Sequence, residues 1–535
     1  MKTSRLIALL TTLVLCFTLL ASCGGSPQTT ESPAAPAPSA EPSAGPVQTV
    51  EGISDETLYV ATEGEPNSLC PLYSGGNVNA RVDVELYDTL VYWNDEKKVA
   101  EPSVATDWEW VDDTHLSLTL RDNVYFSNGD QLTAKDVAFT FTVGAQYSLS
   151  TYYTKLDPEN FEIVDDQHII LAFSAPMPNF IDVVGSTHYA LLSEKSWQDA
   201  GEDLSALAHN PVGSGKYMLQ EWKQGESITL VRNDNYWDQD NLPYYKYITY
   251  YIITDAASRV IALESGQVQV AYSISSAQVE EVDQYEGLNA LVYSQNISNV
   301  VCFNYANEAL KDLNVRKAVA LAINRDAFRQ VSNQGYGDLV DTIYTPSTSV
   351  YTHIEPEAQD LEQARQLLAD AGYGSGLTLN CVCSPANATS AEVLQAQLAE
   401  IGIEVKVEQQ EMATFLNSLF TGAFDIVVSS IDNWDYQMSL VPIDSRNDYA
   451  TAIGGSLYQG EDQQKLYDLI DAASHEMDEA ARLEDYAAVQ QFVADHYVAV
   501  GLCSAIRCEG YSESITGITY DVRGWPCLSF VRPVA

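Results

Sequence analysis

The stretch LTLNCVCSPANATSAEVLQAQLAEIGIEVKVEQQEMATFLNSLFTGAFDIVVSS, residues 377–430, decides the fold class. Short runs rich in Val, Ile and Leu, which are typical of strands, alternate in it with longer segments whose apolar residues have helical spacing. Such β-α-β-α-β alternation indicates a parallel sheet with right-handed crossovers, and therefore an α/β fold. The pattern predicts strands at 377–383, 404–409 and 425–430 and helices at 390–401 and 413–421.

In an open parallel sheet, ligands bind beyond the carboxyl ends of the strands, which here means the loops 384–389 and 431–436. The second loop offers two carboxylates, an amide and two aromatic faces. A polar loop with a half-exposed Trp is the simpler alternative. The candidate ligand-binding residues in these two loops are Asn387, Asp432, Trp434, Asp435 and Tyr436.

Other elements can be placed outside this stretch. Residues 57–62 are expected to form a first strand, 108–120 a hairpin with an Asp-Asp turn, and 134–147 a helix. Asp255 and Asp360 stand where amino-terminal caps of two further helices are expected.

The amino terminus has the features of a secretory signal. Lys2 and Arg5 precede an apolar run at 6–20, which is shorter than the ~20 residues that a membrane-spanning helix needs. The Leu-Ala-Ser-Cys sequence that ends at Cys23 resembles the lipobox of bacterial lipoproteins, which are cleaved before the cysteine and lipidated on it. We therefore expect a signal peptide at 1–22 and, at 23–52, a lipidated Cys23 followed by a mobile tether rich in Pro, Ala and Ser.

The chain is strongly acidic, with 74 Asp and Glu against 27 Lys and Arg and a formal charge of −47. Such a charge repels nucleic acid and anionic membrane surfaces, so no nucleic-acid partner is expected. It serves solubility at the cell surface, or, on a narrower interpretation, it favours cationic or zwitterionic ligands.

Seven cysteines follow Cys23, an odd number spread too widely for the disulfide framework of a small secreted domain. Cys381 and Cys383 point to one face of a predicted strand but have no His nearby in sequence to complete a metal site. We predict buried free thiols, although one or two disulfides remain compatible with the sequence, and we expect no metal or cofactor.

Signatures of catalysis are missing from the sequence. Residues 210–216 end in Gly-Ser-Gly-Lys, but Asn210 replaces the first glycine of a phosphate loop and Tyr217 its Ser or Thr, so a turn is predicted. There is neither a His-Glu-x-x-His pair nor a Gly-x-Ser-x-Gly elbow. No catalytic residue is assigned, and an extracellular hydrolase is the weaker alternative.

The chain resembles a known family, most clearly in the block that begins at Asn210. Asn210-Pro-Val-Gly-Ser-Gly-Lys-Tyr217 is followed by Glu221-Trp222, by Val231-Arg-Asn-Asp-Asn-Tyr-Trp237 and by Asp255-Ala-Ala-Ser-Arg-Val-Ile-Ala-Leu263. This order and spacing resemble the solute-binding lipoproteins of bacterial ABC importers, in the class of dipeptide-, oligopeptide- and nickel-binding proteins (family 5). The resemblance extends over about residues 55–530.

The resemblance implies a bilobal periplasmic-binding-protein-like fold, in which two hinged α/β lobes close on a ligand and lobe one carries an extra subdomain. The implied divisions are lobe one at 53–72, 209–296 and 505–535, its subdomain at 73–208, and lobe two at 297–504.

The resemblance also implies site residues and partners. Relatives hold a peptide's α-ammonium with an aspartate of the loop in which Asp432 and Asp435 stand, and the alignment does not choose between them. The resemblance also implies that Glu65 and Asn67 lie beside the ligand and that the ring of Tyr152 or Tyr153 contacts the ligand. The arginine that dipeptide binders use for the ligand carboxylate has no counterpart near 384–389.

The implied function is capture of a small organic solute by a monomer that is lipid-anchored outside the cytoplasm, and its delivery to ABC permease and ATPase subunits. Peptides are favoured as ligands, oligosaccharides are second and metal complexes third. An extracytoplasmic sensor with the same fold is a second class of function.

Overall fold

The computed structural model describes residues 56–72, 77–94, 97, 99–147, 153, 155–446, 458–460 and 462–534. Every described residue belongs to one compact unit, which we call the second unit because it follows residues 1–49. The predictions for 1–22, for 23–52 and for Cys23 lie outside the described residues. Within the described residues, no helix combines the length and the apolar character that crossing a bilayer requires.

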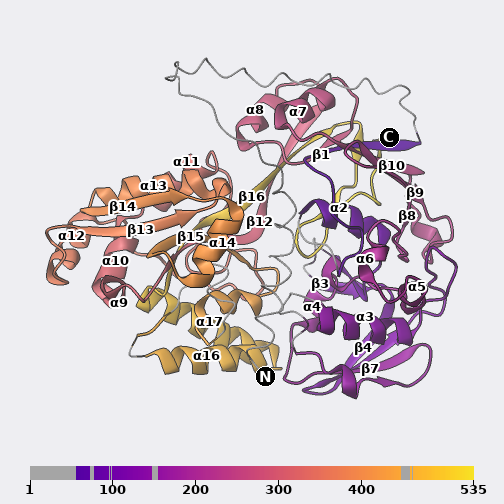
Figure 1. The fold of residues 1–535 in the computed structure, drawn as a ribbon, viewed down its shortest axis with the longest axis horizontal. Coiled ribbons are helices and arrows are strands. Elements are labelled where there is room, and N and C mark those ends of the chain that lie inside the picture. The colour runs from indigo at the N-terminus through magenta and orange to yellow at the C-terminus, as the bar shows by residue number, and fades with distance from the viewer. Residues whose placement is uncertain are drawn as a thin grey trace, which may run out of the picture. The chain divides into compact units, whose positions relative to one another are not determined.

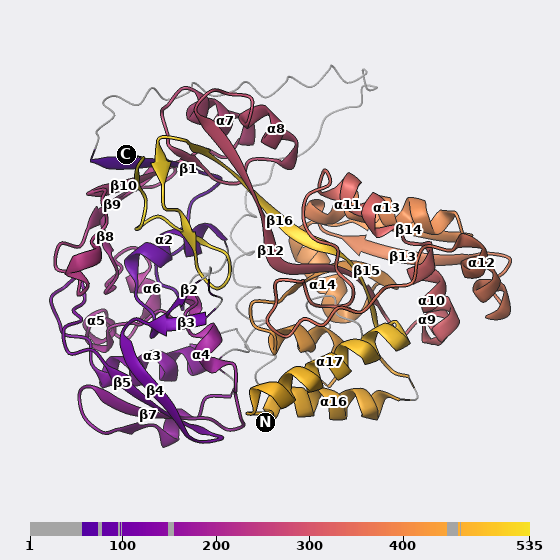
Figure 2. The ribbon, with the colours of Figure 1, turned by 180° about the vertical axis from the view of Figure 1, so that it is seen from behind.

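A ten-stranded sheet organises the second unit (Figures 1 and 2). Its longest strands, β12 (Leu288–Phe303) and β16 (Ala499–Ser512), are antiparallel partners near the middle. We call the part built on the three strands beyond β12 lobe two, and the part built on the five strands beyond β16 lobe one. Beyond β12 lie β15 (Ile426–Asp432), β13 (Leu377–Cys383) and β14 (Ile403–Gln409); beyond β16 lie β11 (Val270–Ala271), β1 (Thr57–Thr62), β10 (Tyr247–Ile252), β9 (Ser227–Arg232) and β8 (Tyr217–Lys223).

The structure confirms the alternation predicted for lobe two. β13 pairs in parallel with both β14 and β15, and α13 (Ala388–Ala399) and α14 (Met412–Thr421) connect these strands. The other helices of lobe two are α9 (Glu308–Lys311), α10 (Leu313–Ala322), α11 (Arg325–Ser332), α12 (Leu361–Asp370), α16 (Gln463–His475) and α17 (Glu479–His496).

Several predicted boundaries are wrong by one or two residues, and the one at the end of β15 moves a candidate site residue. β15 extends to Asp432, so Ile431 and Asp432 belong to the strand rather than to the following loop. The strand is longer because β15 also pairs antiparallel with β12. Ile297 lies opposite Asp432, and this pairing continues the strand beyond the apolar run. The loop proper therefore starts after Asp432.

In lobe one, β1 pairs in parallel with β10 and β11, and its bounds agree with the predicted strand 57–62. α7 (Ala256–Glu264) begins after Asp255, whose side chain accepts a hydrogen bond from the Ser258 backbone N–H and confirms the predicted cap.

The 210–216 segment, predicted as a turn, is an irregular loop with bends at 210 and 215–216, and it packs on the end of α2 (Asn77–Leu86). A Cβ on Gly213 would overlap the Leu86 carbonyl oxygen, and one on Gly215 would lie 2.6 Å from the Glu85 carbonyl oxygen. The Gly215 N–H donates to the Leu86 carbonyl at 3.0 Å. Only glycine permits so close an approach of two backbones.

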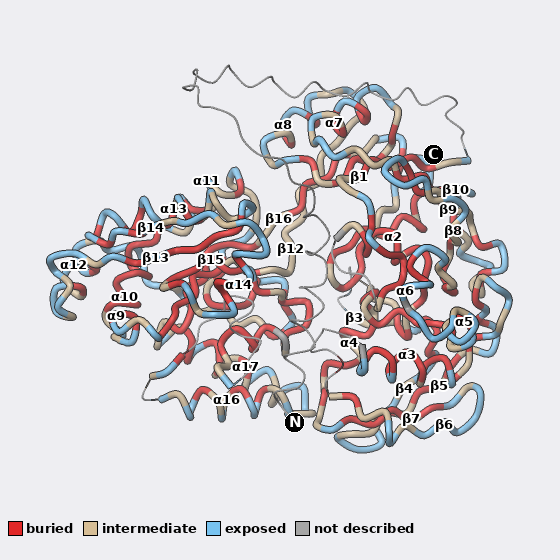
Figure 3. The backbone as a smooth tube through the Cα atoms, in the orientation of Figure 1, coloured by how far each residue is buried: buried red, intermediate tan, exposed pale blue. Residues whose placement is uncertain are grey.

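The elements from β2 to α6 form the part of lobe one that we call the subdomain. Its antiparallel sheet has the order β4-β5-β7-β6, and it confirms the predicted hairpin and the helix at 134–147. In Figure 3 the strands β13 and β15 of lobe two are largely buried, whereas β5 and β7 of the subdomain carry a mixture of buried and more exposed residues and most of β4 is exposed. The elements of the subdomain are β2 (Val91–Asn94), β3 (Val99–Pro102), β4 (Ala105–Asp112), β5 (His115–Leu120), β6 (Glu162–Ile163), β7 (His168–Ala172), α3 (Ala134–Tyr147), α4 (Phe180–Val183), α5 (Glu194–Asp199) and α6 (Leu204–Leu207).

The chain ends on lobe one, after β16. Short strands there form two small antiparallel pairs, β17 with β20 and β18 with β19. The remaining elements are α8 (Val279–Val282), β17 (Ile515–Thr516), β18 (Thr519–Tyr520), β19 (Pro526–Cys527) and β20 (Arg532–Pro533).

The prediction of buried thiols is confirmed for the seven cysteines that the structure describes, which are all buried and outside any disulfide. Burial raises the pKa of Cys503 and of Cys508 to about 11. These thiols are therefore protonated at neutral pH and pack as small apolar groups.

Candidate functional site

The loop after β15 meets lobe one. Asp435 is 2% exposed, and its Oδ1 accepts a hydrogen bond from Asn179 Nδ2 of the subdomain at 2.6 Å. Gln437 donates its backbone N–H to the same oxygen at 3.0 Å and accepts a hydrogen bond from Lys155 Nζ, also of the subdomain, at 3.0 Å. The loop therefore lies where side chains of the two lobes touch.

Asn433 fixes the shape of this loop from within lobe two. Its side-chain oxygen accepts hydrogen bonds from Ser298 Oγ at 2.6 Å and from the Thr345 N–H at 3.0 Å. Its amide nitrogen donates to the Ile343 carbonyl and to Ser439 Oγ, each at 3.0 Å. A buried amide with four hydrogen bonds makes the loop a pre-shaped support for its neighbours.

The two aromatic residues of the loop are mostly covered. Trp434 is 5% exposed and packs in the core of the subdomain, and Tyr436 is 4% exposed. Tyr436 Oη donates to Asp182 at 3.4 Å, and burial raises the pKa of Asp182 to about 6. The Trp434 ring therefore contacts lobe one, whereas the Tyr436 ring packs in the core of lobe two, 5.2 Å from the Tyr486 ring, and reaches lobe one only through its hydroxyl.

Asp432 differs from its neighbours because its side chain is 43% exposed. Its Oδ2 lies 3.5 Å from Nη2 of Arg523, whose side chain is 15% exposed and belongs to the carboxyl-terminal segment of lobe one. The Arg523 guanidinium lies over the Trp434 ring at 4.7 Å and donates to the His188 ring, with Nη1 2.8 Å from Nε2. Burial and the Arg523 charge lower the pKa of His188 well below its usual value, so His188 is a neutral acceptor.

Arg523 was not found from the sequence. It lies far along the chain from Asp432, and only the return of the carboxyl-terminal segment to lobe one brings it opposite the end of β15. The one available signal is local: Asp521-Val-Arg-Gly524 is a turn sequence that contains an arginine.

The other predicted site residues lie within single lobes. Glu65 Oε1 accepts hydrogen bonds from Trp222 Nε1 at 2.7 Å and from the Gly225 N–H at 3.0 Å, and Asn67 Oδ1 accepts one from Asn79 Nδ2 at 2.6 Å. These bonds tie Glu65 and Asn67 to lobe one rather than to the loop after β15.

Asn387 is half-buried at the start of α13, beyond the carboxyl end of β13. It donates to the Val428 carbonyl of β15 at 3.4 Å, so it belongs to the same edge of the lobe-two sheet as Asp432.

Tyr152 lies outside the described residues. Tyr153 is buried in the subdomain, where its hydroxyl donates to the His188 carbonyl and its ring packs on Tyr189 at 5.1 Å. Tyr153 thus supports the short 3-10 helix Thr187–Tyr189 that carries His188.

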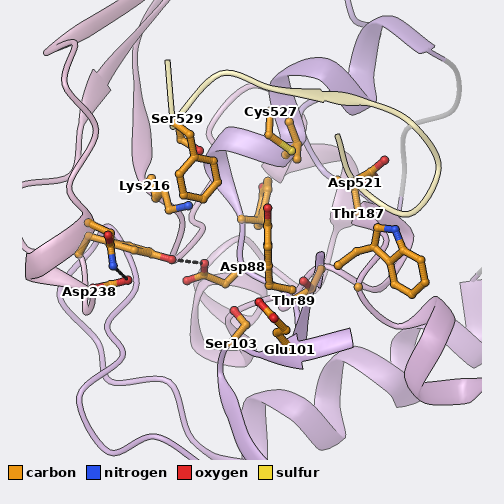
Figure 4. A pocket seen from close by; sticks show the side chains of 18 of the residues that line it. Asp88, Thr89, Glu101, Ser103, Thr187, Lys216, Asp238, Asp521, Cys527 and Ser529 are labelled. Atoms are coloured by element: carbon orange, nitrogen blue, oxygen red, sulfur yellow. Dashed lines mark hydrogen bonds between the residues drawn. The ribbon is translucent and has the colours of Figure 1, made fainter. Parts of the chain in front are cut away.

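A cavity of about 330 Å³ lies inside lobe one, beside this region (Figure 4). Its wall includes Thr187, which precedes His188, and Asp521, which precedes the Arg523 turn. Aromatic side chains make up much of the rest: Tyr87, Tyr92, Trp93, Tyr236, Trp237 and Phe530.

The cavity wall carries buried charges. Asp88 accepts a hydrogen bond from Tyr236 Oη at 3.0 Å, and Lys216 Nζ lies 3.6 Å from the centre of the Phe530 ring. Burial raises the pKa of Asp88 to about 6 and that of Glu85, just behind it, to about 7, while it lowers the pKa of Lys216. Across the described residues, no three His, Cys, Asp or Glu side chains are grouped so as to hold a metal ion.

A bilobal α/β body, joined by long strands and with opposite charges where its lobes meet, has the architecture of a solute-binding protein. Residues 99–449 match the model of the bacterial extracellular solute-binding proteins, family 5, middle region. That match spans well over half of the chain, which therefore belongs to this family. It is a binding protein and not an enzyme, and the predicted bilobal fold is confirmed.

Individual relatives agree with this placement. The chain is 26% identical over 362 residues to the glutathione-binding protein GsiB of Salmonella paratyphi A, covering 66% of this chain and 70% of that protein. It is 25% identical over 508 residues to the dipeptide-binding protein of Escherichia coli K12, covering 88% and 94%. The structure of the periplasmic binding protein DppA from Helicobacter pylori in complex with the peptide STSA is similar with a TM-score of 0.73 at 23% identity, covering 89% and 98%.

Proposed function

We propose that this protein captures a peptide between its lobes and delivers it to an ABC permease. The observation that carries the proposal is the half-exposed Asp432 carboxylate at the carboxyl end of β15, where lobe two faces lobe one. A carboxylate at such a place holds an ammonium group through charge-assisted hydrogen bonds. Trp434, covered by lobe one in this structure, offers a ring face once the lobes move apart, and the Tyr436 hydroxyl, which now donates to Asp182 of the subdomain, then becomes available to the ligand.

Peptides are favoured because two relatives are named for glutathione and dipeptide binding. An oligosaccharide is the alternative ligand, since aromatic faces stack on sugars as well. Native mass spectrometry of protein purified without refolding tests the ligand class. A retained peptide supports the proposal, and a retained hexose polymer contradicts it.

For the lobes we propose the division 53–72, 209–296 and 505–535, with the subdomain at 73–208 and lobe two at 297–504. Two of these boundaries fall inside β12 and β16. The pairing of these strands shifts register between Ser294 and Ser298, and such bulges bend strands locally. This supports a hinge at the bulge, which small-angle scattering with and without a bound peptide would test as a change in the radius of gyration.

We further propose that the protein is anchored outside the cytoplasm through lipid on Cys23, and that it acts as a monomer. The support is the signal sequence followed by a tether rich in Pro, Ala and Ser. Mass spectrometry of membrane-extracted protein should find the modified cysteine, and Cys23→Ser should release the protein or leave it unprocessed. Recovery of wild type cleaved elsewhere and freely secreted would rule the anchor out.

Delivery to a permease and an ATPase separates this proposal from an extracytoplasmic sensor. Deleting the gene should abolish uptake of a labelled peptide that the purified protein binds. Unchanged uptake, with loss of a transcriptional response to the same peptide, would favour the sensor.

A further inference from the structure

We infer that Arg523 forms a carboxylate-binding site on lobe one, opposite Asp432, so that the two residues together select a zwitterionic ligand. This inference rests on the proposed function and deepens it, because it names the charge pattern that the same site recognises.

The first observation is that the Arg523–Asp432 pair is loose. The distance of 3.5 Å between Nη2 and Oδ2 exceeds the 2.7–2.9 Å of a charge-assisted hydrogen bond, and the Asp432 side chain is 43% exposed. Such partly solvated pairs contribute little to stability. A ligand that brings its own carboxylate to Arg523 and its own ammonium to Asp432 replaces one loose pair with two close ones.

The second observation is that Arg523 is held in place before any ligand arrives. Asp521 Oδ1 accepts hydrogen bonds from the backbone N–H groups of Arg523 at 2.9 Å and Trp525 at 2.7 Å. Gly524 has a φ of +75°, donates to the Asp521 carbonyl at 2.8 Å and accepts a hydrogen bond from Arg507. A rigid turn lowers the entropy cost of binding.

The third observation is that the guanidinium keeps donors available. Nη1 donates to the neutral His188 ring, while Nε has no hydrogen-bond partner among the described residues. The rings of Trp434 and Trp525 lie 4.7 and 5.9 Å from its central carbon. A planar fork with free N–H groups beside aromatic rings matches the bidentate geometry of a carboxylate.

The charge of the whole chain narrows the ligand class further. A formal charge of −47 opposes the approach of a simple anion, so Arg523 alone would attract few anionic solutes. A zwitterion carries no net charge and satisfies both residues. Free peptides and amino acids have this pattern, whereas neutral sugars do not.

The test uses the mature protein and titration calorimetry. A panel of dipeptides to tetrapeptides is screened, and the tightest binder is then compared as the free peptide, its carboxyl-terminal amide and its N-acetyl form. Wild type should bind the free peptide ten- to a hundredfold more tightly than the amide. Arg523→Gln should remove this preference but keep the penalty for N-acetylation, and Asp432→Asn should do the reverse.

Arg523→Lys keeps the charge but loses the fork, so it should retain only part of the preference for the free peptide. Arg532→Gln, an exposed arginine of β20 in the same segment, is the matched control and should behave as wild type. If wild type and a folded Arg523→Gln variant preferred the free peptide over its amide to the same extent, the inference about Arg523 would be overturned while the proposed peptide binding would stand. If no peptide in the panel binds wild type, the proposed peptide function fails and the inference with it.

Discussion

Burial separates the two aspartates beside the end of β15 and assigns them different roles. Asp435 is enclosed and holds Asn179 across the lobes, whereas Asp432 keeps its carboxylate accessible. The sequence suggested a carboxylate for an ammonium group but could not choose between them, because both follow the same apolar run. The choice depends on which side chain the other lobe covers.

Asp432→Asn should therefore weaken binding of an amine-bearing peptide by roughly ten- to a hundredfold, since a hydrogen bond to a charged group contributes on the order of 1.5–3 kcal/mol. Calorimetry measures the loss, and Asp468→Asn, an exposed carboxylate on α16, should leave affinity unchanged. A larger loss for a folded Asp435→Asn than for Asp432→Asn would contradict this assignment.

Glu85 provides a pH-dependent test at the same scale. Its pKa rises from 4.5 to about 7 on burial, so the folded state binds the proton more tightly than the unfolded state. The stabilisation from protonated Glu85 is complete below pH 4.5 and is lost as the pH rises to 7, a change on the order of 3 kcal/mol.

Glu85→Gln imitates the protonated form. Compared with wild type, it should have similar stability at pH 4.5 and be more stable at pH 8, with thermal or urea unfolding as the measurement. Comparing the two proteins at each pH cancels the titration of Asp88, Asp521 and His188. An equal difference in unfolding free energy at both pH values would show that Glu85 does not titrate in this range.

The helices and strands could be predicted from the sequence wherever the local pattern of apolar residues alone determines them. The apolar runs of β13, β14 and β15 alternate with helical segments, so their order and type could be predicted. The end of β15 could not, because Asp432 is polar and its pairing with Ile297 is supplied by β12 from far along the chain. Local sequence therefore determines which elements form, whereas contacts with distant segments determine where an element such as β15 ends.

The loop that carries Gly213 gives a test at this scale. Gly213→Ala should destabilise lobe one by about 1–3 kcal/mol, because the new methyl group would meet the Leu86 carbonyl at the end of α2. Gly64→Ala is the control, since its Cβ would make an ordinary contact of 3.6 Å with Val78. Urea unfolding that shows equal effects of the two substitutions would contradict the close approach.

For the whole molecule, the contacts between the lobes come from residues that sequence patterns do not connect. Asn179 and Lys155 of the subdomain, and Arg523 of the carboxyl-terminal segment, all reach the end of β15. A family resemblance predicted two lobes, because it rests on many short motifs. It could not predict these side-chain pairs, because each joins segments that lie far apart in the sequence.

These side-chain pairs should also set the equilibrium between molecules whose lobes touch and molecules whose lobes are separated. Asn179→Ala removes the donor to Asp435 and leaves a buried carboxylate with one hydrogen bond fewer, at a cost of about 1–3 kcal/mol that applies only when the lobes touch. The fraction of molecules with touching lobes then falls, and the apparent Kd rises by the same factor, about tenfold for each 1.4 kcal/mol. Scattering should show a larger radius of gyration without ligand, and saturating peptide should restore the wild-type value.

Asn160→Ala is the control: it removes an exposed amide–carboxylate hydrogen bond of the same subdomain and should change neither the apparent Kd nor the radius of gyration. If Asn179→Ala weakened binding while the radius of gyration stayed that of wild type, Asn179 would act on the ligand directly rather than through the lobes.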